Sequence, residues 1–149
     1  MRYGFGMVAA VALLVTAAVA AADDVGRVKV VKGGVSIERA GRSLPATVGM
    51  KIQEGDVIVT GRDGAAGVTF NDDSLLSVGP DSVLAVDRFA FDTTTHAGRF
   101  DTSLRRGTLS VVSGQLAKQS PDAMKVRTPS TILGVRGTEF VVRAVPVAP

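Results

Sequence analysis

Few residues of this 149-residue chain combine the types and the spacing that chemistry needs. Glu54-Gly55-Asp56 places two carboxylates one residue apart, and such a pair could hold a cation or act as an acid and a base. Gly and Asp are also ordinary turn residues, because Gly tolerates positive φ and Asp bonds to nearby backbone N–H groups. We therefore interpret Glu54-Gly55-Asp56 as a turn.

Two further clusters could serve a metal or a reaction. Asn71-Asp72-Asp73-Ser74 gathers oxygen ligands, but it lacks the wider spacing and the final Glu of a calcium loop. His96 is the only His, and one His makes neither a zinc site nor a proton relay unaided. The chain has no Cys and no Gly-x-Ser-x-Gly elbow. The sequence therefore predicts no catalytic residue, no metal and no cofactor, which means a protein that is not an enzyme.

One arginine stands out by its neighbours. Arg136 lies between Gly134 and Gly137, and the stretch begins at Thr128-Pro129, where Pro favours an extended backbone before it. Two glycines three residues apart predict a tight corner that aims the guanidinium in one direction. Arg136 then either forms an ion pair with an acid such as Glu139 or meets a partner, and both interpretations stay open.

The elements that position these residues have the pattern of β-strands. Between residues 25 and 143 no window repeats apolar residues at helical spacing over three turns. Short alternating segments recur instead, separated by Gly, Asp, Asn and Pro. They lie at residues 28–30, 35–37, 50–52, 57–59, 66–70 and 76–78. The sequence predicts an all-β domain, with a compact solenoid-like or β-helical stack of short strands as first choice and a sandwich as second.

Two longer half-apolar runs, 83–91 and 102–116, are each expected to cover one face of the core, with Leu84, Val86 and Arg88 on the same face. Residues 92–98 and 117–123 are expected to be loops. The predicted structural turn residues are Gly55, Asp56, Gly64, Gly107, Gly134 and Gly137.

Residues 1–22 have the pattern of a secretory signal peptide, which predicts a helix. Arg2 precedes an apolar run from Phe5 to Val19, and Ala20-Ala21-Ala22 offers a cleavage site. An uncleaved anchor is the alternative. We expect cleavage near Ala22, a periplasmic or secreted domain over 23–143, and a flexible tail at 144–149. No later stretch is long enough to span a membrane, so none is expected in the mature chain.

The charge pattern argues against nucleic acid as a partner. The 17 basic and 14 acidic residues give a net charge of +3, and the basic ones are scattered, with Arg105-Arg106 the only adjacent pair. Nucleic-acid binding usually shows a basic stripe or stacking aromatics, and the chain has no Trp and one Tyr.

The stretch 128–140 has the form Thr-Pro-x-x-x-x-Gly-x-Arg-Gly-Thr-x-Phe, which resembles the signature of the FecR domain family. The resemblance extends over about residues 26 to 143, through 54–61, 63–70, 73–82 and 107–114. It implies a compact all-β domain with solenoid character. Asp73 stands where relatives carry Gly, so this turn must accept a left-handed Asp or change type.

The resemblance also implies a function. FecR domains often form the periplasmic part of sigma-factor regulators that sense a TonB-dependent receptor. This chain shows no anti-sigma segment and no membrane span after residue 22, so we expect binding of an envelope protein, in signalling or scaffolding. Relatives usually add a strand or two after the segment that corresponds to Glu139-Phe140, so the last layer is expected to leave a free edge for β-augmentation. The expected partner-binding residues are Arg136, Glu139, Thr128 and Phe140.

Two other functions were considered. A carbohydrate or cell-wall binding β-solenoid protein would need an exposed aromatic row, and the phenylalanines are too spread to predict one. They are Phe70, Phe89, Phe91, Phe100 and Phe140. An enzyme would need Glu54, Asp56, Arg136 and Glu139 to line one cleft.

Overall fold

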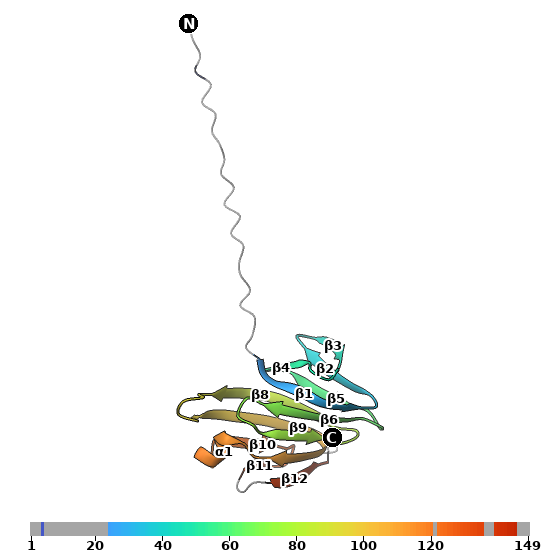
Figure 1. Cartoon of the computed structure of the whole chain (residues 1–149). Coiled ribbons are helices and arrows are strands. Elements are labelled where there is room, and N and C mark those ends of the chain that lie inside the picture. The colour runs from blue at the N-terminus through green and yellow to red at the C-terminus, as the bar shows by residue number, and fades with distance from the viewer. Residues whose placement is uncertain (1–3, 5–23, 121, 136–138, 146–149) are drawn as a thin grey trace.

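A computed structural model describes residues 4, 24–120, 122–135 and 139–145. Within these ranges the protein is all-β, as the sequence predicts, with one short helix (Figure 1). The elements in chain order are β1 (Asp24–Lys32), β2 (Val35–Arg39), β3 (Arg42–Pro45), β4 (Lys51–Gln53), β5 (Val57–Thr60), β6 (Ala65–Phe70), β7 (Leu75–Val78), β8 (Val83–Phe91), β9 (Gly98–Val112), α1 (Gln115–Gln119), β10 (Met124–Arg127), β11 (Ile132–Gly134) and β12 (Glu139–Ala144).

The strands form one curled sheet, a half-barrel whose two halves are joined by β9. The first part of β9 pairs with β8 and β10, and its last part pairs with β7 and β12. We call β4, β1, β6, β7, the last part of β9 and β12 half A. Half B is β3, β2, β5, β8, the first part of β9, β10 and β11. β9 changes halves at Gly107, whose φ is +95° and where a Cβ would collide with Ser82.

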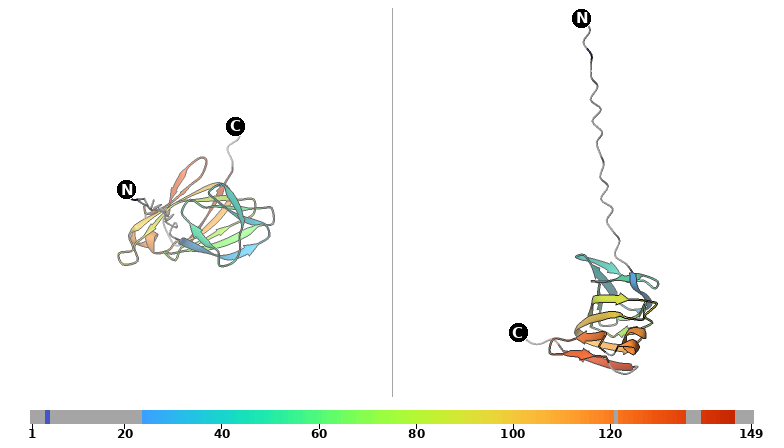
Figure 2. Two further views of the ribbon diagram at one scale, coloured as in Figure 1. Left: turned by 90° about the horizontal axis from the view of Figure 1, so that it is seen from above. Right: turned by 90° about the vertical axis from the view of Figure 1, so that its left-hand side faces the viewer.

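The layers follow the chain. The N-terminal strands β2, β3 and β4 lie at one end, and β10, β11 and β12 lie at the other (Figures 1 and 2). Among the described strand pairs, β9–β10 is parallel and the rest are antiparallel. Stacking of strands rung on rung as in a solenoid is therefore not confirmed. Hairpins such as β6–β7 and β8–β9 turn the chain back within one half, which makes neighbouring strands antiparallel.

Corners between the halves are tied to one another by backbone hydrogen bonds. Gly61 N donates to Gly34 O at 2.9 Å, and Asp81 N donates to Gly61 O at 3.0 Å. Gly79 N donates to Thr108 O, also at 3.0 Å. These bonds place successive corners side by side along one edge of the half-barrel, where close backbone contact favours residues without a Cβ.

The two halves close on a single hydrophobic core. Phe70 of half A packs against Phe100 and Phe89 of half B, with ring centroids 4.5 Å and 5.7 Å apart. Phe89 meets Phe100 edge to face at 4.9 Å. Aromatic pairs in such geometries add about 0.5–1.5 kcal/mol beyond their buried area. This cluster joins the two walls of the half-barrel.

The alternation predicted for the 83–91 run is wrong at its far end. Leu84 and Val86 are fully buried, but Arg88 is exposed and Phe89 takes the core position. The register of β8 against β9 shifts between Val86 and Arg88, so a bulge inserts one residue and reverses the alternation. Glu54 Oε2 accepts a hydrogen bond from Phe89 N at 3.1 Å, which satisfies a donor just past the bulge.

The other carboxylate of the Glu54–Asp56 segment is buried in an ion pair. Asp56 is 1% exposed, and it accepts from Arg39 Nε at 2.9 Å, from Arg39 Nη2 at 2.7 Å and from Gln53 N at 2.8 Å. The side-chain hydrogen bond to Asp56 raises the pKa of Arg39 above its ordinary value. Gly55 has φ of +90° in the turn between β4 and β5. This arrangement holds β2 against the β4–β5 turn.

The structure also departs from the sequence prediction elsewhere. β3 was not predicted, β9 ends at Val112 rather than continuing to residue 116, and α1 begins before the expected loop at 117–123. Leu116 is fully buried on α1, so tertiary packing selects a helix in a segment of weak local pattern. β12 runs through Ala144, one residue into the predicted tail.

The predicted signal-peptide helix at residues 1–22 lies outside the described residues, apart from Gly4. No helix in the described part of the chain has the length and apolar character needed to cross a membrane.

Candidate partner-binding surface

The last strand, β12, is hydrogen-bonded along one side. It pairs with β9 from Glu139 opposite Val112 to Ala144 opposite Gly107, and no other described strand pairs with it. Its side chains alternate, with Val142 and Ala144 buried and Val141 70% exposed. Because no other described strand pairs with β12, its other side is an edge of the sheet, six residues long, within the described part of the chain.

The three other edge strands are poorer templates for pairing. β3 has Arg42 at one end and Pro45 at the other, and β4 and β11 are three residues each. Short strands, charge and Pro are the usual means of blunting a sheet edge. Among the described edge strands, β12 is thus the longest, and its sequence Glu-Phe-Val-Val-Arg-Ala is mainly apolar.

An apolar surface on the outside of half A adjoins this edge. Leu75 lies opposite Val112, and Val112 lies opposite Glu139, so the three share one row across β7, β9 and β12. Leu75, Val112 and Val141 are all exposed. Side chains of a strand added beside β12 could contact Val141 directly and the row behind it at longer range.

The structure separates the residues expected to bind a partner. Glu139 begins β12 and is exposed, and Phe140 next to it is partly buried against the core. Thr128 lies in the β10–β11 hairpin turn, where its N–H donates to Thr131 O at 2.8 Å and its Oγ1 accepts from Thr131 N at 3.2 Å. Arg136, like Gly137, falls outside the described residues, so both interpretations of it stay open.

The remaining predicted turn residues occupy different settings. A Cβ at Gly64 would collide with Gly34 O in the β5–β6 corner. Gly134 ends β11, and nothing lies within 4 Å of the place where its Cβ would be. Among the described residues, a Cβ at Gly134 would therefore meet no other atom, although the Gly134 backbone pairs with Lys125 of β10.

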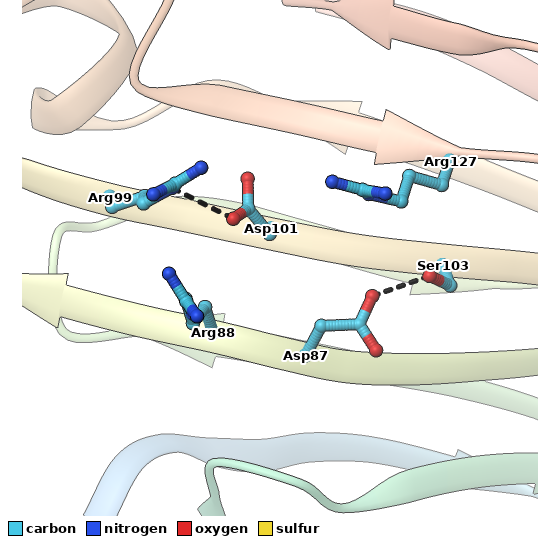
Figure 3. A pocket seen from close by; sticks show the side chains of 6 residues that line it. All are labelled: Asp87, Arg88, Arg99, Asp101, Ser103 and Arg127. Carbon is cyan, nitrogen blue, oxygen red and sulfur yellow. Dashed lines mark hydrogen bonds and ion pairs between the residues drawn. The ribbon is translucent and has the colours of Figure 1, made fainter.

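A polar cleft on the outside of half B was missed by the sequence analysis. It has a volume of about 440 Å³ and lies over β8, β9 and β10 (Figure 3). Strand register assembles it, since Arg88 lies opposite Asp101 and Arg127 lies opposite Ser103. We call it the arginine cleft; it is lined by Asp87, Arg88, Arg99, Asp101, Ser103 and Arg127.

The charges of the arginine cleft are only partly paired. Arg99 Nε lies 2.9 Å from Asp101 Oδ2, and Ser103 donates a short hydrogen bond to Asp87. Asp101 is 5% exposed, and its Oδ1 is buried without a hydrogen-bond partner in the part of the chain that the structure describes. Figure 3 shows the Arg127 guanidinium beside Asp101, across from Arg99.

The sequence shows a polar alternation in the strands that line the cleft. Arg99, Asp101 and Ser103 alternate along β9, as Lys125 and Arg127 do along β10, so each set projects from one face of its strand. The parallel pairing of β10 with β9 brings the two sets together, and it joins segments about two dozen residues apart. No local pattern in the sequence indicates that pairing.

The Asn71–Ser74 cluster serves the fold. The Asp72 carboxylate is fully buried and accepts from Ser74 N at 3.0 Å, Ser74 Oγ at 2.7 Å and Leu116 N at 3.4 Å. Gly114 N donates to Ser74 Oγ at 3.0 Å. These bonds fasten the β6–β7 hairpin to the start of α1. Asp73 has φ of +68°, so this turn accommodates an Asp in the left-handed region.

The other candidate residues do not converge. Glu54 and Asp56 are engaged with β8 and Arg39, whereas Glu139 lies on β12 in the last layer of the sheet. No group of three or more His, Cys, Asp or Glu within the described ranges could hold a metal ion. Of the phenylalanines, Phe70, Phe89 and Phe100 are buried in the core, so they form no exposed row.

A family comparison agrees with this fold. The model of the FecR protein family matches residues 56–147, which include every strand from β5 to β12. No curated protein and no solved structure matches the chain. The matched region covers more than half of the sequence and carries both the β12 edge and the arginine cleft. The chain therefore belongs to the FecR family.

Proposed function

We propose that this protein is a non-enzymatic FecR-type domain that binds an envelope protein, in signalling or as a scaffold. Membership of the FecR family, which is linked to envelope signalling, supports the setting. One observation carries the binding role: β12 is a six-residue, mainly apolar edge strand that pairs with β9 alone among the described strands.

The proposed mechanism is β-augmentation. A partner strand adds beside β12 and forms main-chain hydrogen bonds with its open edge, and these bonds provide affinity without regard to sequence. Selectivity comes from side chains of the added strand that contact Val141 and the apolar surface of Leu75 and Val112. Removing this apolar area from water adds about 25 cal/mol for each Å² that is buried.

The proposed location follows from the sequence. Residues 1–22 act as a signal peptide in this proposal, and they deliver the domain to the periplasm or the exterior. There it meets its partner without needing to carry a signal through the membrane itself.

Site-specific photo-crosslinking in cells tests the proposal. A photoreactive phenylalanine analogue replaces Val141 in one variant and Lys29 in another, because Lys29 is an exposed position on β1, away from β12. We expect discrete crosslinks to an envelope protein from position 141 and none from position 29. Equal products from both positions, or no product from position 141, would count against an interface at β12.

Hydrogen exchange then tests the mode of binding. The envelope protein identified by crosslinking is purified and added, without crosslinking, to the full chain. Amides of Glu139–Ala144 that face the open edge should then exchange more slowly, because β-augmentation protects edge amides. The amides of Arg42, Ser43 and Leu44 in β3, on the edge at the other end of the sheet, serve as the control. Protection of β3 in place of β12 contradicts the proposed site.

A further inference from the structure

The arginine cleft contains hydrogen-bond donors and an acceptor that lack partners among the described residues. The guanidiniums of Arg88 and Arg127 make no side-chain hydrogen bond or ion pair with any residue that the structure describes. Asp101 Oδ1 is a buried acceptor that receives no hydrogen bond from the described residues. The great majority of buried polar atoms in proteins have partners. A carboxylate oxygen that lacks a described donor, in a cleft also lined by Arg88 and Arg127, therefore indicates a place for a ligand.

The guanidiniums of Arg88 and Arg127 and the Asp101 Oδ1 atom indicate the chemistry of that ligand. Guanidinium groups form paired, charge-assisted hydrogen bonds with carboxylates, which makes an acid the natural counterpart of Arg88 and Arg127. Asp101 Oδ1 needs an N–H or O–H donor, since an ionised carboxylate only accepts. Sulfate carries no such donor, and the negative charges of Asp87 and Asp101 oppose a dense polyanion. The ligand therefore combines carboxylates with hydrogen-bond donors.

The shape of the surface favours a polypeptide. Small-molecule sites enclose most of their ligand and are mainly apolar, whereas this cleft lies on the outer face of a sheet and is lined by charged and hydroxyl groups. A second hollow of about 240 Å³ shares Ser103 and Arg127 with it and continues to Thr128 and Pro129. The two hollows together follow β9 and β10, so they suit an extended segment.

We propose that the arginine cleft binds an acidic peptide segment of the protein partner. Acidic side chains of the segment pair with Arg88 and Arg127, and a backbone N–H donates to Asp101 Oδ1. This inference rests on the proposed partner-binding function, but it concerns the outer face of half B rather than the β12 edge.

Fluorescence anisotropy with the full chain provides the test. The probe is a labelled, end-capped peptide Gly-Glu-Gly-Asp-Gly-Glu-Gly, compared with the same peptide carrying Gln and Asn. We expect the acidic peptide to bind at least tenfold more tightly than the neutral one. The double variant Arg88→Gln with Arg127→Gln should lose about a hundredfold in affinity, because each of the two charge-assisted bonds contributes about tenfold. The matched control is Arg62→Gln, an exposed arginine in the β5–β6 loop, which should bind as the parent does.

A third variant tests the donor requirement. Asp101→Asn removes the acceptor charge and frees Arg99, so it should raise the affinity for inorganic sulfate and lower the ratio of acidic-peptide affinity to sulfate affinity several-fold. Circular dichroism and urea unfolding establish that each variant remains folded. If sulfate displaces the peptide from the parent protein at equal concentration, the cleft is a simple anion site and the proposal is wrong.

Other outcomes separate this inference from the proposed function. Equal binding of the Gln and Asn peptide, no binding of the acidic peptide at millimolar concentration, or unchanged binding by the double variant would each overturn it. A uronic-acid oligosaccharide that binds more tightly than the peptide would also overturn it, because it assigns the cleft to a polysaccharide. Crosslinking from position 141 does not depend on these results, so a failure of the cleft proposal is distinguishable from a failure of the proposed function.

Discussion

Replacing Arg39 with Met removes the cationic partner of a buried carboxylate and keeps an unbranched apolar stem. In the parent protein Asp56 accepts three hydrogen bonds, two from Arg39 and one from Gln53 N. Arg39→Met leaves the last of these, so a carboxylate that is 1% exposed loses its counter-ion.

The expected cost can be bracketed from the geometry. Breaking a fully buried ion pair by removing one partner costs about 3–5 kcal/mol. The Arg39 side chain is 29% exposed, so water reaches part of the vacated space and the penalty is smaller. We expect Arg39→Met to lower the free energy of unfolding by about 2–3 kcal/mol. The exposed pair of Lys51 with Asp24, at 3.4 Å, serves as the control, and Lys51→Met should cost about 0.5 kcal/mol or less.

Urea unfolding followed by circular dichroism measures both variants. A double variant, Arg39→Met with Asp56→Asn, replaces the buried charge by a neutral amide and should recover part of the loss. The cycle formed with the single variants then isolates the interaction between Arg39 and Asp56. The loss should persist in about 1 M salt, where the Debye length is about 3 Å and surface pairs are screened.

The reasoning would be refuted by a specific result. If Arg39→Met unfolds within about 0.5 kcal/mol of the parent, or no differently from Lys51→Met, the Asp56 site is hydrated and the pair behaves as a surface contact. A double variant less stable than either single variant would show that side-chain packing, and not charge, accounts for the loss.

Three further predictions concern backbone and loop positions. Gly107→Ala should cost about 3 kcal/mol or more in urea unfolding, against about 1–2 kcal/mol for Gly49→Ala, because both have positive φ but only Gly107 lacks room for a Cβ; equal losses would show that the β9 corner relaxes freely. Ala40→Asn should raise the free energy of unfolding by about 0.5–1 kcal/mol, because Ala40 has φ of +50° in the β2–β3 turn and Asn tolerates that region; a loss would mean that the turn has another conformation. Hydrogen bonds from the N–H groups of Thr95 and Thr94 lower the pKa of Asp92 in the folded state. The stabilisation that Asp92 provides is therefore complete above the unfolded-state pKa and is lost as the pH falls through the lower folded-state pKa. An NMR titration of Asp92 with an ordinary midpoint would contradict this.

The fold class followed directly from the sequence because its signals are local. Alternating apolar residues, broken by Gly, Asp and Asn, indicate short strands wherever they occur, and strands are observed at each of the six short segments predicted. The ordered motifs from residue 54 to residue 140 resemble those of the FecR family, and the family model matches 56–147.

Local pattern was insufficient where a neighbour in space decides the conformation. The bulge after Val86 exchanged Arg88 for Phe89 in the core, because Phe89 completes a ring cluster with Phe70 and Phe100 that closes the half-barrel. α1 forms because its Leu116 is buried and Asp72, more than 40 residues earlier, accepts the N–H groups at its start.

The two proposed partner surfaces also depend on neighbours in space and not on local sequence pattern. The alternation of β12 is visible in the sequence, but its open edge depends on which strands pair and in what order. The arginine cleft depends on the parallel pairing of β10 with β9, which sets Arg127 beside Ser103 and near the buried Asp101. Sequence alone determined that this chain makes short strands with glycine corners; tertiary structure decided which side chains meet, because strand order and register arise from packing over the whole domain.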